Sequence, residues 1–494
     1  MIMYVRMLFL IVLSFYTSRL LLAMLGVEDF GIQSVIGSIA STFLSVKALF
    51  SESIQRFLNF EKGKNSLDGQ RSIFTLGIVI HLILAFVFVA LVEVIGCWLI
   101  ANKLEIPAER IYTAYFFFHI TVFSVFISIY SIPYDAVIIA NEKMGIYALV
   151  TVIDAVLKLG AVFLLAVTPF DKLCTYAVLL LVVPLFTLSF QLIYCRRFPE
   201  CKLTRTPDKK IIKELFSLSS WNFFGNMAFS LVHEGMNMLL NVFGGLIYNT
   251  ARTIAYQVKG VASQLTNNTI ISVRPKIMQQ AASSARDVLF NNINHVSRIA
   301  FFTILIPVSM LLTFTESLLG IWLIEVPPYA SLFTQIMLLS AVVRSLHEPL
   351  NMLYMALGVI KRMMIIESCV MIAFLIIIYA SLKMGAPMWL PFVEIVLMEV
   401  TINILLILNA NKEIRMPLSP YFKKVIVPFV TLTFIIVIFS YTISSCVSPK
   451  TVIGILFLTA LVGVFHSIIV FAMLDSRERQ IISGLLNKLV KRTK

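Results

Sequence analysis

Residues 72–101 read SIFTLGIVIHLILAFVFVALVEVIGCWLIA and contain a single acidic residue, Glu93, and no lysine or arginine. About 20 consecutive apolar residues are enough for a helix to cross the hydrocarbon core of a bilayer. Lipid offers no hydrogen-bond partners, so the backbone of such a segment must satisfy its own polar groups within a helix. This stretch therefore predicts a transmembrane helix.

Comparable runs fill the rest of the chain, in which 59% of the residues are hydrophobic and 13% are charged. A soluble domain carries about 25% charged residues, so this composition excludes an ordinary soluble enzyme. The predicted spans lie near residues 2–25, 30–58, 72–101, 112–140, 145–168, 173–195, 217–243, 250–273, 299–322, 331–357, 364–382, 388–410, 425–443 and 451–474. We therefore expect an all-α polytopic membrane protein with about 14 transmembrane helices.

The net charge of +14 comes from basic residues whose positions alternate with the spans. With the N-terminus in the cytoplasm, the cytoplasmic segments hold 27 of the 40 Lys and Arg residues, the outside loops hold five and the spans hold eight. This skew follows the positive-inside rule and predicts that both termini are cytoplasmic. The basic residues then orient the protein in the membrane and contact anionic lipid head groups. No nucleic-acid partner is expected.

The six cysteines are scattered along the chain. No CxxC motif occurs and no histidine stands at ligand spacing from a cysteine, so the sequence predicts no metal site and no disulfide. No cofactor is expected either.

The longest predicted cytoplasmic break is rich in basic residues and holds Pro199 and Pro207, with six spans before it. We therefore predict an N-terminal six-helix lobe (1–195), a basic cytoplasmic linker (196–216), a C-terminal six-helix lobe (217–410), helices 13 and 14 (411–474) and a basic cytoplasmic tail (475–494).

The two lobes match each other at widely separated positions. Gly26, after the first span, corresponds to Gly244, after the seventh, at an offset of 218, and Pro133 corresponds to Pro349 at an offset of 216. Each copy holds an even number of spans, so the copies share one orientation and are related by a pseudo-two-fold axis along the membrane normal.

Polar residues recur every three or four positions in the seventh and eighth spans, which places each set on one helical face. The set in the seventh span is Asn222, Asn226, Ser230, His233, Asn237 and Asn241, and the set in the eighth is Arg252, Tyr256, Lys259, Ser263 and Asn267. The serines of the second span, Ser34, Ser38, Ser41 and Ser45, correspond to Arg252, Tyr256, Lys259 and Ser263 when 218 is added. An ionisable side chain at mid-bilayer costs about 2.5–3.5 kcal/mol, so we predict that the stripes of spans 7 and 8 line an aqueous cavity. The alternative is that serine and asparagine join packed helices, and for the serines of span 2 the two interpretations are equally good.

Three pairs of opposite charges stand four residues apart on a helix and are predicted to be structural salt bridges: Glu52 with Arg56, Asp154 with Lys158, and Arg344 with Glu348. Other ionisable residues within spans have no such partner on their own helix. Among these, we consider His233, Glu234 and Glu399 as candidates for coupling transport to an ion gradient.

Several motifs occur together in order along the chain. They are Arg19-Leu20 with Leu25-Gly26-Val27-Glu28-Asp29-Phe30-Gly31 after the first helix, Ala140-Asn141-Glu142-Lys143 after the fourth, and Gly244 with Tyr248 after the seventh. With the six-plus-six-plus-two arrangement, the chain resembles the superfamily that contains the O-antigen and capsule flippases, the lipid II flippase and the multidrug (MATE) exporters. Within this multidrug/oligosaccharidyl-lipid/polysaccharide exporter superfamily, the polysaccharide flippases are the closest in pattern.

The resemblance implies two six-helix lobes around a V-shaped cavity lined by helices 1, 2, 7 and 8. It also implies that the cargo is an oligosaccharide on undecaprenyl diphosphate, moved across the bacterial inner membrane from the cytoplasmic to the periplasmic leaflet for surface polysaccharide biosynthesis. By position, the cavity cations of such relatives correspond to Arg19, Arg56, and Arg252 or Lys259. Expected partners are the lipid-linked oligosaccharide, membrane lipids and the polysaccharide polymerase machinery.

The residue chemistry agrees with that cargo, because a diphosphate that leaves water needs cations, and asparagine amides both donate to and accept from sugar hydroxyls. A drug or metabolite exporter of the same fold is the nearest alternative, although it would favour acids over bases in its cavity.

A membrane polymerase or ligase would need a larger outside loop than the loops of about ten residues expected here. A scaffold without transport would not explain the repeated polar stripes.

Overall fold

The computed structural model describes residues 2–63, 66–141, 143–204, 209–283, 286–447, 451–475 and 479. Side chains outside the description include those of residues 2–8, 40–53, 55–56, 59–60 and 209–226. Arg56, Asn222, Asn226 and the pair of Glu52 with Arg56 therefore lie outside the described side chains, as does nearly all of the predicted tail.

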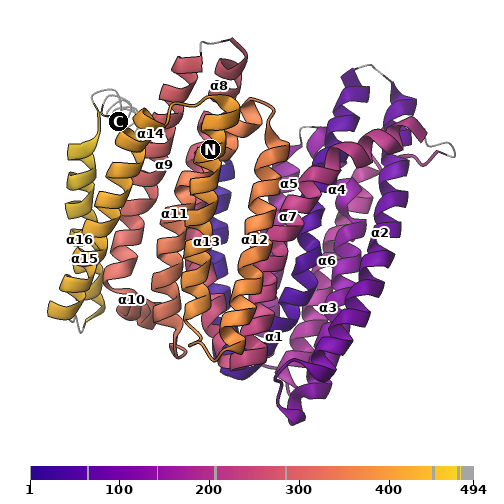
Figure 1. Cartoon of the computed structure of the whole chain (residues 1–494). Helices are drawn as coiled ribbons and strands as arrows, with labels where there is room; N and C mark the ends of the chain where they lie inside the picture. Colours follow the sequence, from indigo (N-terminus) through magenta and orange to yellow (C-terminus); the bar gives the residue numbers. More distant parts are fainter. Residues whose placement is uncertain are drawn as a thin grey trace, which may run out of the picture. The chain divides into compact units, whose positions relative to one another are not determined.

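All regular secondary structure in the described residues is helical (Figure 1). The first part of the chain forms α1 (Ile2–Gly63), α2 (Leu67–Asn102), η1 (Ala108–Arg110), α3 (Ile111–Tyr130), α4 (Ile132–Ala140), α5 (Met144–Leu165), α6 (Lys172–Cys195), η2 (Pro199–Cys201) and α7 (Lys209–Gly244). The second part forms α8 (Leu246–Ser283), α9 (Arg286–Thr313), α10 (Thr315–Trp322), α11 (Ala330–Ala356), α12 (Ile360–Lys383), α13 (Leu390–Asn409), η3 (Ala410–Ile414), α14 (Leu418–Tyr421), η4 (Phe422–Ile426), α15 (Val427–Cys446) and α16 (Val452–Met473).

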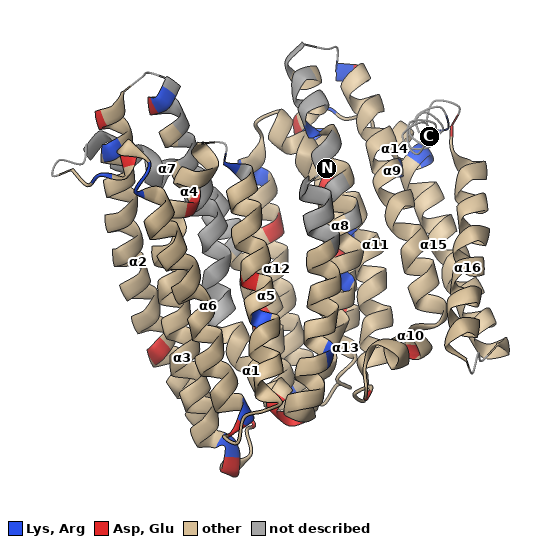
Figure 2. Cartoon of the chain, turned by 180° about the vertical axis from the view of Figure 1, so that it is seen from behind, with Lys and Arg blue, Asp and Glu red and all other residues tan. Residues whose placement is uncertain are grey.

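Each predicted span coincides with a helix, half of a helix or consecutive short helices, so the prediction of an all-α polytopic membrane protein is confirmed. Among the described residues, 11 helices are long and apolar enough to cross a membrane. The number is below 14 because spans 1 and 2 are both parts of α1, and because α7 and α8, which carry the polar stripes, are not among the 11. Figure 2 shows that charged residues are sparse along most of the helices.

The matched glycine turns of the two halves both break a helix. Gly26 has φ 78° inside α1, where it separates the first two predicted spans, and Gly245 has φ 87° between α7 and α8. Positive φ is a conformation that glycine adopts without steric cost. The sequence match placed the second break one residue early, at Gly244.

Several helices differ in extent from the predicted spans. Residue 283 ends α8, ten residues beyond the prediction, and α9 begins at Arg286, thirteen residues before it. Hydropathy detects only the apolar part of a helix, and these polar extensions continue the helices past it. The predicted span 112–140 is divided at Ser131, because Pro133 has no amide hydrogen and a new helix begins beside it.

The helices group into two compact units. Unit 1 holds residues 1–250 and 371–388, and unit 2 holds residues 251–370 and 389–494. In unit 1, α7 packs extensively against α1. The lobe boundaries derived from the sequence remain a prediction.

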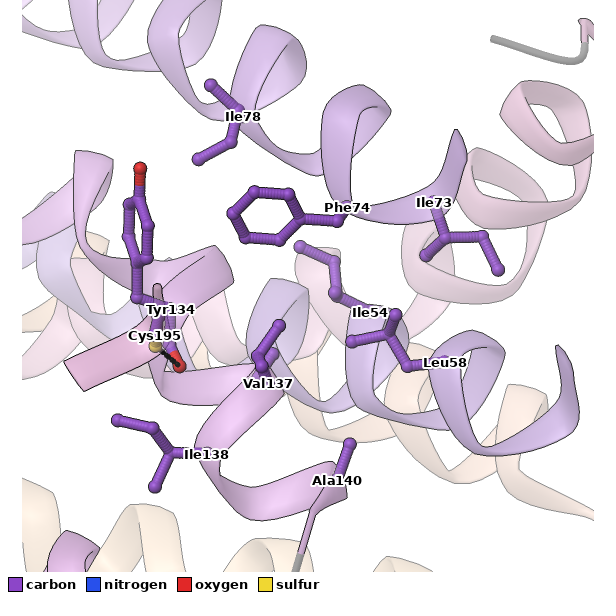
Figure 3. Close-up of a cluster of buried hydrophobic side chains, with 11 residues drawn as sticks. Ile54, Leu58, Ile73, Phe74, Ile78, Tyr134, Val137, Ile138, Ala140 and Cys195 are labelled. Atoms are coloured by element: carbon purple, nitrogen blue, oxygen red, sulfur yellow. Dashed lines mark hydrogen bonds between the residues drawn. The ribbon is translucent and has the colours of Figure 1, made fainter. Parts of the chain in front are cut away.

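One core of unit 1 lies where α1, α2, α4 and α6 meet. Figure 3 shows Ile54 and Leu58 from α1 beside Ile73, Phe74 and Ile78 from α2. The Phe74 ring meets the ring of Tyr134 edge-on, with centroids 5.4 Å apart. Lipid is as apolar as these side chains, so close packing rather than escape from water favours such contacts within the membrane.

The first residues of the predicted linker are attached to unit 1. The Asn141 side-chain amide donates to Glu200 Oε1 at 2.6 Å, and Lys62 Nζ donates to Asn141 Oδ1 at 3.0 Å. Arg71 Nε donates to the carbonyl of Pro199 at 3.0 Å. Asn141 in the turn after α4 therefore joins the end of α1 to the segment that follows α6.

In unit 2, α9 packs against α11, α15 and α16. Phe301 of α9 meets Phe429 of α15 with ring centroids 4.8 Å apart. The buried Arg298 of α9 donates to the carbonyls of Lys424 and Met473, at 3.2 and 2.7 Å. Arg298 thereby binds a carbonyl of η4, which leads into α15, and the carbonyl of the last residue of α16, so it attaches these last two helices to α9.

Candidate functional site

The basic stripe of α8 forms one face of this helix in unit 2. Arg252 and Lys259 are 6% and 9% exposed. The Arg252 guanidinium lies 4.1 Å from the centre of the Tyr256 ring, and Lys259 Nζ lies 5.7 Å from it. Cation–π contacts of this kind stabilise a cation that has left bulk water. The structure thus brings Arg252, Tyr256 and Lys259 together, and Ser263 continues the stripe as a half-buried residue.

Lys259 also connects α8 to α11. Its Nζ donates to Ser340 Oγ at 2.9 Å, and it lies within electrostatic range of Glu399, Arg344 and Arg252. Ser340 stands one turn before Arg344 on α11. The stripe of α8 therefore faces a second set of ionisable groups rather than lipid.

This second set is an ionisable network on α11, α12 and α13. Arg344 contacts Glu348 of its own helix at 3.5 Å and Glu399 of α13 at 3.2 Å. His347 Nε2 lies 2.7 Å from Glu367 of α12, and its Nδ1 lies 3.5 Å from Glu348. Three carboxylates thus share one guanidinium and one imidazole, and all five side chains are mostly or fully buried.

The predicted pair of Arg344 and Glu348 is confirmed, and so is that of Asp154 and Lys158, at 2.8 Å. Glu399, a predicted ion-coupling residue, has Arg344 as its partner. Sequence reasoning missed His347 and its contact with Glu367. The spacing of Arg344, His347 and Glu348 on one helix was an available signal, but Glu367 and Glu399 are brought in only by the tertiary fold.

The asparagines of α7 belong to unit 1 and are bonded to protein groups. Asn237 Nδ2 donates to the Ser34 carbonyl at 3.1 Å, and Asn249 Nδ2 donates to Asn237 Oδ1 at 2.9 Å. Asn241 Nδ2 donates to Asn249 Oδ1 at 3.1 Å, while its Oδ1 accepts from the Glu105 amide at 2.8 Å. Asn237 and Asn241 are 1% and 0% exposed, so in this structure they join α7 to α1, to the start of α8 and to the loop after α2.

The other predicted residues of unit 1 are less deeply placed. Ser230 is buried, and His233 and Glu234 are half-buried. The His233 ring lies 4.2 Å from the Phe229 ring. Arg19 is half-buried on α1, and no acceptor among the described residues lies within hydrogen-bonding distance of it.

A further charged group joins helix ends in unit 1. Arg110 Nε donates to Asp29 Oδ1 at 2.8 Å, and the same guanidinium binds Asp171, which caps α6 through the Cys174 amide. Burial raises the pKa of Asp171, but the hydrogen bond from Cys174 and the Arg110 guanidinium outweigh it, so this pKa is lowered from its ordinary value. The Arg110 cluster therefore fixes α1, α3 and α6 to one another at one end of unit 1.

No protein-family model and no curated protein matches this sequence. Among solved structures, the chain is similar to the lipid II flippase MurJ in an inward closed conformation, with a TM-score of 0.67 at 14% identity over 97% of this chain and 99% of that one. It is also similar to an inward-facing multidrug resistance MATE family transporter of the MOP superfamily, with a TM-score of 0.64 at 13% identity over 83% of this chain and 96% of that one.

The chain has the fold of these transporters. The MurJ likeness extends over nearly the whole of both chains, so it includes α15 and α16. With the 11 apolar helices, this makes the chain a multi-pass membrane protein of transporter fold. At such low identity the likeness establishes the fold, and the cargo has to be argued from the residues.

Proposed function

We propose that this protein is a flippase that moves an oligosaccharide linked to undecaprenyl diphosphate across the bacterial inner membrane, for surface polysaccharide biosynthesis. The observation that carries the proposal is the buried cationic face of α8, formed by Arg252 and Lys259. Two basic side chains in a low-dielectric setting are costly to charge unless an anion offsets them. A diphosphate is an anion of matching charge.

The geometry of these cations suits a phosphate ligand. Arg252 is stacked on Tyr256, so the edge of its guanidinium, where the N–H donors lie, can contact phosphate oxygens in two places at once. Lys259 has three N–H donors and gives one to Ser340, which leaves two for cargo. Arg19 is proposed as a further phosphate contact from its position in the sequence. For Arg56, Asn222 and Asn226, the proposal rests on the sequence alone.

The electrical driving force favours export of a diphosphate. A membrane potential of 100 mV is worth about 2.3 kcal/mol per charge, so two negative charges moving outward gain about 5 kcal/mol at most. Cations of the protein that moved with the cargo would reduce this gain. We therefore propose that an ion gradient contributes as well.

The ionisable network is our candidate for this coupling. Glu399 holds Arg344, so a proton or cation that neutralises Glu399 would weaken its contact with Arg344. Arg344 could then pair with Glu348 alone, next to the Ser340 hydroxyl that binds Lys259. His233 and Glu234 of α7 remain alternative carriers proposed from the sequence.

Substitution of the α8 cations tests the proposal in cells. Arg252→Ala and Lys259→Ala, singly and together, should lower surface glycan at least tenfold while membrane protein levels stay unchanged, because the diphosphate loses its counter-charges. Arg286→Ala removes an exposed cation at the start of α9 and serves as the matched control. Surface glycan at the wild-type level in the double variant would refute the cationic site.

A drug or metabolite exporter is the second candidate, and the three carboxylates of the ionisable network favour it, since acids bind cationic drugs. The chain is similar to MATE transporters as well as to MurJ. The exporter predicts that Glu399→Gln lowers resistance to cationic drugs while Arg252→Ala does not. The flippase predicts no change in drug resistance from either substitution.

A further inference from the structure

Three side chains with metal-binding atoms meet on unit 1, and none of them belongs to the α8 stripe or to the ionisable network. Glu93 and Cys97 stand one turn apart on α2, and His119 faces them from α3. His119 Nδ1 lies 2.9 Å from Glu93 Oε2, and Cys97 Sγ lies 3.8 Å from the same oxygen. One ligand atom from each residue falls within 4.8 Å of the other two. From this geometry we propose that Glu93, Cys97 and His119 form a binding site for Zn²⁺.

The donor set matches the coordination chemistry of zinc. Zn²⁺ takes sulfur at about 2.3 Å, and nitrogen or oxygen at about 2.0–2.2 Å, in a tetrahedron. With these bond lengths and tetrahedral angles, a ligand sulfur lies about 3.5 Å from a ligand oxygen, and a ligand nitrogen lies about 3.3 Å from that oxygen. The separations of 3.8 and 2.9 Å found here differ from these by only a few tenths of an ångström. Three protein ligands leave the fourth position to water.

A neighbouring residue holds this arrangement in place. Tyr115 stands one turn before His119 on α3, and its ring stacks on the imidazole with centroids 6.2 Å apart and planes inclined by 22°. Its hydroxyl donates to the Cys97 carbonyl at 3.3 Å. Tyr115 therefore contacts both helices and orients two of the three ligands, as outer residues around metal ligands do.

The site lies toward the end of α2. Trp98 follows Cys97 directly, and Lys103 at the end of α2 lies 5.7 Å from its ring. Tryptophan and lysine mark the boundary between lipid and water, so Cys97 stands near that boundary. The His119 side chain is 51% exposed and that of Glu93 is 32% exposed, so neither of these two ligands is enclosed by protein.

The simplest alternative is a hydrogen bond between Glu93 and His119 that joins α2 to α3. That contact explains two of the residues but requires nothing of Cys97. A zinc site requires a Cys97 thiolate, and this requirement separates the two explanations experimentally.

Cobalt substitution and thiol labelling of the purified full-length protein test the site. After removal of metals with a chelator, Co²⁺ should give a thiolate-to-cobalt absorption band that Zn²⁺ abolishes, and Zn²⁺ should protect Cys97 from maleimide, as located by mass spectrometry. Cys97→Ser should lose the band, and His119→Ala and Glu93→Gln should bind at least about 10-fold more weakly.

Cys174→Ser is the matched control, because Cys174 also has a nearby carboxylate, Asp171, and should be dispensable for the band. The Cys97→Ser and His119→Ala variants should unfold in detergent without metal at the same temperature as the wild type, which shows that they fold. Absence of the thiolate band in the wild type, or equal affinity in the wild type and His119→Ala, would overturn the zinc site. Neither result bears on the proposed cargo.

Discussion

Arg344 is the counter-charge of two carboxylates, one half-buried and one fully buried. It contacts Glu348 and Glu399 at once, and Glu399 is only 1% exposed. Removal of one member of a buried ion pair leaves the other charge uncompensated, which costs far more than the pair itself contributes. Removing one charge of the pair should therefore lower the free energy of unfolding more than removing both charges together.

Arg344→Ala should lower the free energy of unfolding by about 3–5 kcal/mol, because Glu399 then loses the cation that is in direct contact with it. Arg344→Met combined with Glu399→Met should cost clearly less, because the remaining Glu348 still has His347 beside it. Thermal unfolding in detergent measures both. A double variant as unstable as the single one would show that the contact with Glu399 does not control stability.

At this scale the sequence predicts contacts within a helix and misses contacts between helices. Arg344 with Glu348 and Asp154 with Lys158 follow from the spacing of four residues. Glu399 is 55 residues from Arg344, and His119 is 22 residues from Cys97, so no local pattern joins them. Asn237 and Asn241 stand on the predicted polar face of α7. The spacing of polar residues along a helix does not distinguish a face that lines a cavity from one that forms a buried hydrogen-bond network.

At the scale of elements, the close approach of α1 to the first residue of α8 depends on Gly31. A Cβ at this position would lie 2.6 Å from the Leu246 carbonyl oxygen and 2.9 Å from Leu246 Cβ, both within unit 1. Leu246 follows the turn at Gly245, so its backbone has little room to move away. The sequence predicted the glycine turns, because glycine after an apolar run marks a helix end. It could not predict this contact.

Gly31→Val should destabilise the protein by about 1–3 kcal/mol, the usual effect of overpacking. Gly37→Ala, two turns later on α1, is the matched control, because a Cβ there meets nothing closer than 3.9 Å and alanine favours a helix. The readout is the unfolding temperature in detergent. Equal stability of the two variants would mean that α1 and Leu246 do not pack as closely as the structure places them.

The Arg110 cluster gives a prediction about pH. The pKa of Asp171 is lower in the folded protein than its ordinary value of 3.8, so its ion pair stabilises the protein above that pH. This stabilisation is lost as the pH falls through the lowered pKa.

Asp171→Asn keeps the oxygen that caps α6 but removes the charge. The variant should unfold at a lower temperature than the wild type at neutral pH, and the difference should shrink on acidification below about pH 4. A difference that does not change with pH would contradict this role of the Asp171 charge.

At the scale of the whole molecule, composition and span count are sufficient to predict an all-α polytopic membrane protein, and the motif resemblance adds the transporter fold. Fourteen apolar runs with a matched internal offset leave few other architectures, and the likeness to MurJ over 97% of the chain agrees with this expectation. Cargo is harder to predict than fold, because it depends on a few charged side chains whose surroundings are set by tertiary contacts. The central claim is that Arg252 and Lys259 on α8 bind the diphosphate of a lipid-linked oligosaccharide.

The most direct test of that claim is a flipping assay in proteoliposomes. The probe is a fluorescent oligosaccharide on undecaprenyl diphosphate, and an impermeant quencher reports how much of it has changed leaflet. The wild type and Arg286→Ala should move the probe much faster than protein-free vesicles, and the Arg252→Ala, Lys259→Ala double variant should be at least tenfold slower. Transport by the double variant at the wild-type rate, or none by the wild type, would contradict the claim.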